Sequence, residues 1–220
     1  AFLLERAHES TYRVRAFLQF AGEEAKHIQL FKEFTKEFHK NFLVECEVVG
    51  PAAAVSQAVL SHQPLAVALA ILHIEWMSQI HYTDSIKDDQ DLDPQFKNLL
   101  KFHWLEEAQH AKLDTLIVEA LADGMTEEEI EKAVDGYLEI GGFLDKACRQ
   151  QAILDLDAFE RATRHVLTDA EREDFIVIQH QANRWTYLGS GMTHPRFLAT
   201  LEKLSPAQRK RIEDVAPMFS

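Results

Sequence analysis

The sequence contains Glu-Glu-Ala-Lys-His at residues 23–27 and Glu-Glu-Ala-Gln-His at residues 106–110. Each stretch ends in a Glu-x-x-His pair, namely Glu24 with His27 and Glu107 with His110. Side chains three residues apart on a helix stand one above the other on the same face. A carboxylate and an imidazole placed in this way can bind one metal ion together. The near-repeat therefore predicts two metal-binding helices.

Both pairs lie on the expected apolar face of a helix. The first face has apolar residues at alternating spacings of four and three around the ligand pair: Phe20, Glu24, His27, Phe31, Phe34 and Phe38. The second face follows the same rule: Phe96, Leu100, His103, Glu107, His110, Asp114, Ile117 and Leu121. Such spacing is typical of the inward face of a helical bundle.

A third apolar face carries a single acidic residue, Glu75: Leu65, Ala68, Leu72, Glu75, Gln79, Tyr82 and Ile86. The turn after this face centres near Asp91, with Glu75 16 residues before it and Glu107 16 residues after it. An antiparallel hairpin would set these two carboxylates side by side. Burying an unpaired carboxylate costs several kcal/mol. We therefore expect bound cations to compensate the buried charges.

The rest of the chain also predicts an all-α fold. Glycine (8) and proline (6) are few, and no segment shows sustained alternation of polar and apolar residues. Capping residues and proline positions indicate six or seven helices. The first expected helices run over about 10–42, 52–60 and 61–86. The next runs from Pro94 to about Asp123, with Asp93 as its cap. Three further helices are expected to start at the capping residues Thr126, Thr168 and Ser205.

We expect a single domain over 1–220, with a bundle core in 1–124 and additional helices in 125–220. The net charge of −13 argues against nucleic acid and anionic membranes as partners. No stretch is long and apolar enough to span a membrane. Two cysteines without a CxxC motif indicate a reduced, cytoplasmic protein. Because the chain begins with Ala1 inside a helix-like phrase, we expect residues to precede it.

Two Glu-x-x-His helices and a Glu on a third resemble the ferritin-like di-iron carboxylate superfamily, over roughly residues 10–122. His103 extends the second motif to His-x-x-x-Glu-x-x-His, which is similar to the p-aminobenzoate N-oxygenase group, where such a histidine ligates iron. The resemblance implies a four-helix bundle core and two iron ions, or manganese, or one of each.

The resemblance implies a non-haem dimetal oxidase or oxygenase. Its metal ligands would be Glu24, His27, Glu75, His103, Glu107 and His110, with Glu24, Glu75 and Glu107 as the catalytic carboxylates. O₂ and a small molecule would be the substrates. Electrons would come from an external donor, because the chain has no dinucleotide-binding or iron–sulfur motif. The resemblance also allows a homodimer.

In one respect the sequence departs from the superfamily, which takes another carboxylate from a helix before the first Glu-x-x-His. The pair Glu5/His8 is too near the start of the first long helix, since Glu24 lies about 20 Å into that helix. The ligand would lie before Ala1 or come from a later helix. Weak candidates on that helix are Asp155, Asp157 and Glu160.

Other interpretations remain open. A ferroxidase would turn over Fe(II) in a large hollow oligomer, and a non-enzymatic helical protein would retain only a vestigial site. His103 is either a ligand or a core histidine, and Asp114 is expected to orient a ligand histidine. Gln79 and Tyr82 either line the cavity or pack, and His73, His81, Trp76 and Trp104 are expected to pack. The Gly141-Gly142 pair predicts close packing or a kink.

Overall fold

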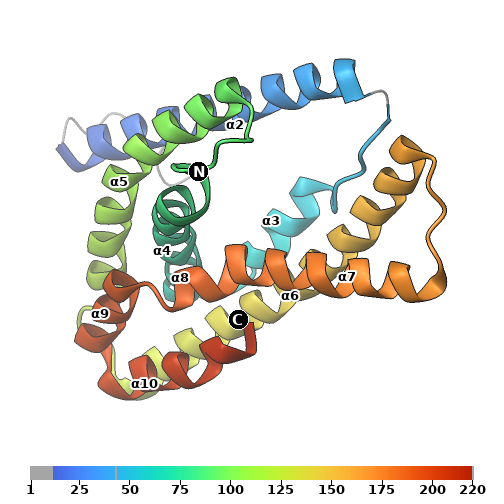
Figure 1. The fold of residues 1–220 in the computed structure, drawn as a ribbon. Coiled ribbons are helices and arrows are strands. Elements are labelled where there is room, and N and C mark those ends of the chain that lie inside the picture. Colours follow the sequence, from blue (N-terminus) through green and yellow to red (C-terminus); the bar gives the residue numbers. More distant parts are fainter. Residues whose placement is uncertain (1–11, 43, 220) are drawn as a thin grey trace. The chain divides into compact units, whose positions relative to one another are not determined.

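The computed structural model describes residues 12–42 and 44–219, and these residues form helices and connections without a β-strand. The predicted all-α class is confirmed. The α-helices are α2 (Tyr12–Phe42), α3 (Ala52–Leu60), α4 (Pro64–His81), α5 (Pro94–Ala122), α6 (Glu127–Thr163), α7 (Asp169–Arg184), α8 (Ser190–Met192), α9 (Pro195–Leu204) and α10 (Pro206–Val215). Figure 1 shows their course.

The chain divides into two compact units, Ala1–Leu43 and Val44–Ser220. The described part of the first unit is α2, a helix of 31 residues. On its polar side, Gln19 donates to Glu23 and Gln29 donates to Glu33, both across one helical turn. Such pairs at four-residue spacing stabilise a helix.

Helices of the second unit begin where the capping residues predict. The Asp93 carboxylate accepts from the backbone N–H of Phe96 at 2.9 Å and opens α5, with Pro94 as its first residue. Capping boxes open α6 at Thr126 and α7 at Thr168. Each box satisfies backbone N–H groups that the first helical turn leaves without partners.

The helix expected over 61–86 is divided in the structure. Ser61 closes α3, α4 starts at Pro64, and the chain continues after His81 as one π-helical turn, η1 (Tyr82–Ile86). In this turn Lys87 N donates to Tyr82 O at 2.8 Å. A second π turn, η2 (Trp185–Gly189), links α7 to α8. Periodicity did not predict either turn, because both lie within otherwise helical sequence.

The core of the second unit is built around α4. Helices α5, α6 and α8 all pack against α4, and α6 packs against α7 (Figure 1). The largest fully buried side chains come from several helices and include Leu65, Leu69 and Leu72 of α4, Phe197 and Leu201 of α9, and Ile212 of α10. Segments far apart in the sequence thus share one apolar core.

Glycines mark two close approaches to α4. A Cβ at Gly191 would lie 2.4 Å from His73 Cδ2, so only glycine fits this position in α8. At Gly141-Gly142, where the sequence predicts close packing or a kink, α6 continues without a break. A Cβ at Gly141 would meet Met192 at an ordinary contact distance of 3.5 Å. Gly142 has open space beside it. The tight approaches to α4 therefore occur at Gly191 in α8 and at Gly136 in α6, where a Cβ would lie 3.0 Å from Ala66 Cβ.

The irregular segment before α3 is bound to α6 by side chains of that helix. Gln151 Oε1 accepts from Val49 N at 3.0 Å, and Gln151 Nε2 donates to Glu47 O at 3.1 Å. Arg161 donates to Glu45 O at 2.8 Å. All three bonds use the backbone of the segment.

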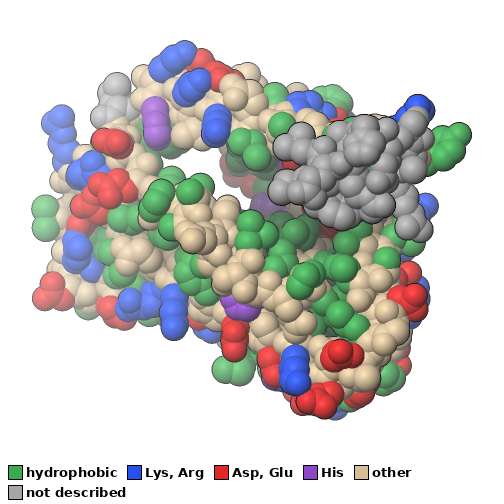
Figure 2. Space-filling model, turned by 180° about the vertical axis from the view of Figure 1, so that it is seen from behind, with side chains coloured by type: hydrophobic (Ala, Val, Ile, Leu, Met, Phe, Trp, Pro, Cys, Tyr) green, Lys and Arg blue, Asp and Glu red, His purple; other side chains and the backbone are tan. Residues whose placement is uncertain are grey.

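The surface carries charged and apolar side chains together. Figure 2 shows one face, on which hydrophobic side chains lie among acidic and basic ones. Large apolar side chains are exposed on several helices, including Ile71 of α4, Phe102 and Leu116 of α5 and Ile178 of α7. Within residues 12–42 and 44–219, none of the helices combines the length and hydropathy that a bilayer crossing requires.

Candidate metal centre

Glu107 lies between two histidines on the inner face of α5. Its Oε1 is 2.6 Å from His103 Nε2, and its Oε2 is 2.6 Å from His110 Nδ1. The four- and three-residue spacings place both imidazoles on the same face as the carboxylate. Glu107 is 4% exposed and His110 2% exposed, whereas His103 reaches the edge of the cluster and is partly exposed. The predicted clustering of these three residues is observed.

Glu75 joins this cluster from α4. It is buried, and its side chain shares a hydrogen bond with Glu107. The contact shows that the α4–α5 hairpin sets positions 75 and 107 level, as their equal distance from Asp91 predicts.

The surroundings of Glu107 favour its charged form. Burial by itself would raise the pKa of this carboxyl group. Hydrogen bonds from His103 and Glu75, together with the charges of His103 and His110, outweigh burial and lower the pKa of Glu107 to about 2. A buried carboxylate that stays ionised is a suitable ligand for a cation.

The residues next to the cluster clamp α4 against α5. Gln79 Nε2 donates to Trp104 O at 3.0 Å, and the Tyr82 ring stacks on Trp104 with centroids 4.8 Å apart. These contacts favour packing over cavity lining for Gln79 and Tyr82. Asp114, one turn after His110, is also buried on this side of α5. Its expected role of orienting a ligand histidine stays a prediction.

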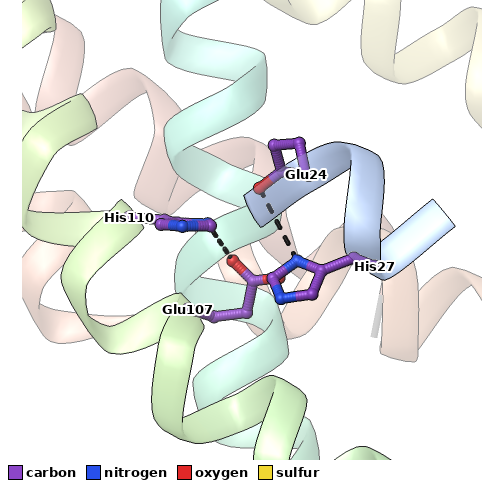
Figure 3. Close-up of side chains that lie close together, drawn as sticks. All are labelled: Glu24, His27, Glu107 and His110. Atoms are coloured by element: carbon purple, nitrogen blue, oxygen red, sulfur yellow. Dashed lines mark ion pairs between the residues drawn. The ribbon is translucent and has the colours of Figure 1, made fainter. Parts of the chain in front are cut away.

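The second Glu-x-x-His pair lies on α2. Glu24 Oε1 is 3.8 Å from His27 Nδ1, as the three-residue spacing requires. Figure 3 shows this pair and the Glu107–His110 pair, with the ion pair within each drawn as a dashed line. Each of these residues offers a carboxylate oxygen or an imidazole nitrogen as a ligand atom.

The candidates for the additional carboxylate have other partners in the second unit. Asp155 accepts from Gln151 and Gln179, at 2.8 and 3.2 Å. Asp157 pairs with Arg161 at 2.9 Å, and Glu160 pairs with Arg172. Glu5 and His8, set aside on distance, lie outside the described residues.

Sequence reasoning missed the role of His73, which was expected only to pack. His73 is buried, with Nδ1 2.5 Å from the Tyr137 hydroxyl and Nε2 3.1 Å from the Tyr187 carbonyl. Burial lowers the pKa of this histidine to about 4, although the bond to Tyr187 opposes the shift. The sequence of α4 did contain a signal for this, because the helix is apolar on almost all sides. Such helices are buried on more than one side, so a histidine within one is expected to be buried and hydrogen-bonded.

The donors that this site offers are carboxylate oxygens and imidazole nitrogens. Such donors suit Fe(II), Mn(II) and other divalent first-row ions better than soft ions that require thiolates. The residues present therefore fit a metal of this class. Comparison of the chain with protein-family models, with curated proteins and with solved structures gave no match.

Proposed function

We propose that this protein is a non-haem dimetal oxidase or oxygenase that holds two iron ions, or manganese, or one of each. The observation that carries the proposal is the buried Glu107 carboxylate, in contact with two imidazoles of its own helix and with Glu75 of the neighbouring helix. Three of these four groups are buried, and buried carboxylates are costly unless they are paired or a cation is bound.

A single-metal site on α5 would leave the first Glu-x-x-His pair without a role. Glu24 and His27 repeat the spacing and the residue types of Glu107 and His110, and all four are donors that can hold a metal ion. We therefore propose that Glu24, His27, Glu107 and His110 together would hold two ions, with the glutamates as carboxylate ligands and the histidines as nitrogen ligands. This ligand arrangement, and the ferritin-like bundle that it resembles, are parts of the proposal.

The remaining residues would shape the reactivity of the centre. Glu75 would be a terminal carboxylate that can exchange its bond to Glu107 for a bond to metal. His103 would add one nitrogen donor at the exposed edge. Apolar neighbours such as Leu72 would exclude water from the site. When bound, the reduced metal pair would supply the electrons and coordination needed to activate O₂, with an external donor restoring them.

Metal content tests the proposal directly. The full chain is loaded with Fe(II) without oxygen, desalted and measured by elemental analysis and Mössbauer spectroscopy. We expect about two iron ions per chain, magnetically coupled after oxidation. Glu24→Gln and Glu107→Gln should each abolish the coupled pair. The preceding glutamates supply matched controls, because Glu23→Gln and Glu106→Gln change the same residue type one position away.

Two outcomes would contradict the dimetal proposal. One is a metal content of one ion per chain or less. The other is a coupled pair that survives Glu24→Gln, since this would show that α2 supplies no ligand. Light scattering separates the ferroxidase alternative: a hollow shell of many subunits that consumes O₂ only with Fe(II) as substrate would replace the oxygenase proposal.

A further inference from the structure

A groove with a volume of about 540 Å³ lies on the second unit, where α4, α5 and α9 meet. Trp76 of α4 lines it, together with Ala108 and Leu116 of α5. The leucine side chain is 56% exposed, although it is large and apolar. Ligand sites commonly have volumes of 300–1,000 Å³ and mostly apolar walls. This groove has the size and lining to hold one small organic molecule.

The groove is lined by more positive than negative side chains, whereas the chain as a whole is negatively charged. It is lined by three cations, Lys112, Arg196 and Lys203, and one carboxylate, Glu119. Lys203 and Glu119 form an ion pair at 2.7 Å and neutralise each other. Lys112 and Arg196 have no carboxylate partner within the described part of the chain. Two uncompensated cations at one groove are unusual in a protein with a net charge of −13.

Trp76 connects the cationic and apolar parts of the groove. The Arg196 guanidinium lies 5.6 Å from the centre of the Trp76 ring, and His194 stacks on the same side chain at 4.7 Å. A cation–π contact holds the guanidinium in place with its N–H donors still available. The Trp76 Nε1–H is itself buried without a hydrogen-bond partner among the residues that the structure describes.

We propose that this groove binds a small carboxylic acid with an apolar body. Arg196 would take the carboxylate through two parallel N–H bonds, which suits its planar fork, and Lys112 would add a second charge. Trp76, Ala108 and Leu116 would cover the apolar body of the ligand. Inorganic phosphate would satisfy the cations but leave these apolar side chains uncovered, so we expect it to bind more weakly.

The proposal is independent of the metal centre. Lys112 follows His110 by two residues, which corresponds to about 200° around the helix. The groove and the metal ligands therefore occupy different faces of α5. Binding of the acid is expected with metal-free and with metal-loaded protein alike.

Calorimetric titration of the full, metal-free chain tests the groove with octanoate and 2-naphthoate as probes. Octanol and inorganic phosphate serve as the neutral and the purely anionic comparisons. We expect at least one acid to bind one-to-one, with octanol and phosphate each at least about tenfold weaker. The double variant Lys112→Gln/Arg196→Gln should weaken binding of the acid by about tenfold or more. Lys101→Gln, an exposed lysine on the same helix, should leave it unchanged.

A second variant tests the groove without a change of charge. Ala108→Phe fills it from an exposed position, so the fold should persist and the acid should no longer bind. The inference is overturned if neither acid binds, if phosphate binds as tightly as the acids, or if octanol does. It is also overturned if a bound acid keeps its affinity in both the charge variant and the Ala108→Phe variant, as it would at another site.

Discussion

At Glu107, one carboxylate lies within 2.6 Å of an imidazole nitrogen on either side of its own helix position. His110 is buried beside it, whereas His103 lies at the partly exposed edge of the cluster. The two histidines therefore have different access to solvent and to small molecules. If both bind metal, His103 is the ligand whose removal least disturbs the rest of the site.

We predict that His103→Ala retains both metal ions but changes the rate of O₂ consumption by roughly tenfold or more, because altered ligation tunes metal reactivity. Iron content and stopped-flow oxygen kinetics of the Fe(II)-loaded protein would measure the two effects. His81→Ala, at another partly buried histidine outside the cluster, is the control. Unchanged kinetics in His103→Ala would show that His103 packs rather than ligates.

His73 gives the protein a defined sensitivity to acid. Its pKa is about 4 in the folded protein against 6.5 in the unfolded chain, so only the unfolded state binds the proton in the interval between these values. The free energy of unfolding should therefore fall as the pH drops from 6.5 towards 4, by roughly 2 kcal/mol at pH 5. Burial also lowers the pKa of His81 and His194, so these histidines further reduce the free energy of unfolding as the pH falls.

Urea unfolding at pH 7 and pH 5, with EDTA present, would measure this loss. His73→Gln should be less stable than the natural protein at pH 7 but should lose less stability on acidification. His39→Gln, at an exposed histidine, should keep the full loss. An equal loss in His73→Gln would mean that His73 is not the group responsible.

At the residue scale, contacts within one helix could be predicted from the sequence, whereas contacts between helices could not. Spacings of three and four placed His103, Glu107 and His110 on one face, because helix geometry alone decides that. The bond between His73 and Tyr137 joins residues 64 positions apart. It depends on how α4 and α6 pack, which no local pattern contains.

At the scale of elements, the helix starts depend on single side chains. Thr126 Oγ1 accepts from Glu129 N, and Glu129 Oε2 accepts from Thr126 N at 2.8 Å. Removal of an N-cap side chain typically costs about 1 kcal/mol. We predict that Thr126→Ala lowers the free energy of unfolding by about this amount.

Chemical denaturation would test the cap, with Thr163→Ala at the other end of α6 as control. That hydroxyl lies at an exposed helix end, where it donates to Phe159 O at 2.8 Å and accepts from His165 N at 3.2 Å, and water can replace both bonds. Its loss should cost under about 0.5 kcal/mol. Equal effects of the two variants would argue against a special role of the capping box.

Element boundaries were predictable where capping chemistry is local, as at Asp93, Thr126 and Thr168. The two π turns were not, since each replaces an α turn without a glycine or proline to mark it at its start. In η1 the turn keeps both Tyr82 and Ile86 buried, and residues four apart would share a face in an α-helix as well. Apolar spacing alone cannot distinguish this from a continued α-helix.

At the scale of the molecule, the core of the second unit draws on residues from both halves of the sequence. Helices α9 and α10 contribute Phe197, Leu201 and Ile212 to the cluster that surrounds Leu69 of α4. The all-α class followed from composition and periodicity. The contribution of the last helices did not, because short amphipathic helices give no sign of the surface they will cover.

We predict that Leu69→Ala destabilises the protein by about 2–5 kcal/mol, because Leu69 is fully buried where α4 meets this core. Ile71→Ala on the same helix removes an apolar side chain that is 42% exposed and should cost clearly less. Urea unfolding of both variants gives the comparison. Similar losses would show that the packing around α4 differs from that described here.

The bonds from α6 to the segment before α3 predict where the chain tolerates change. Gln151 and Arg161 bond to the backbone of residues 45, 47 and 49, so the side chains at those three positions take no part. In a library of variants, positions 45, 47 and 49 should accept many replacements, whereas Gln151 should accept few. A designer could use the segment to carry a label or graft, provided that its partners on α6 are kept.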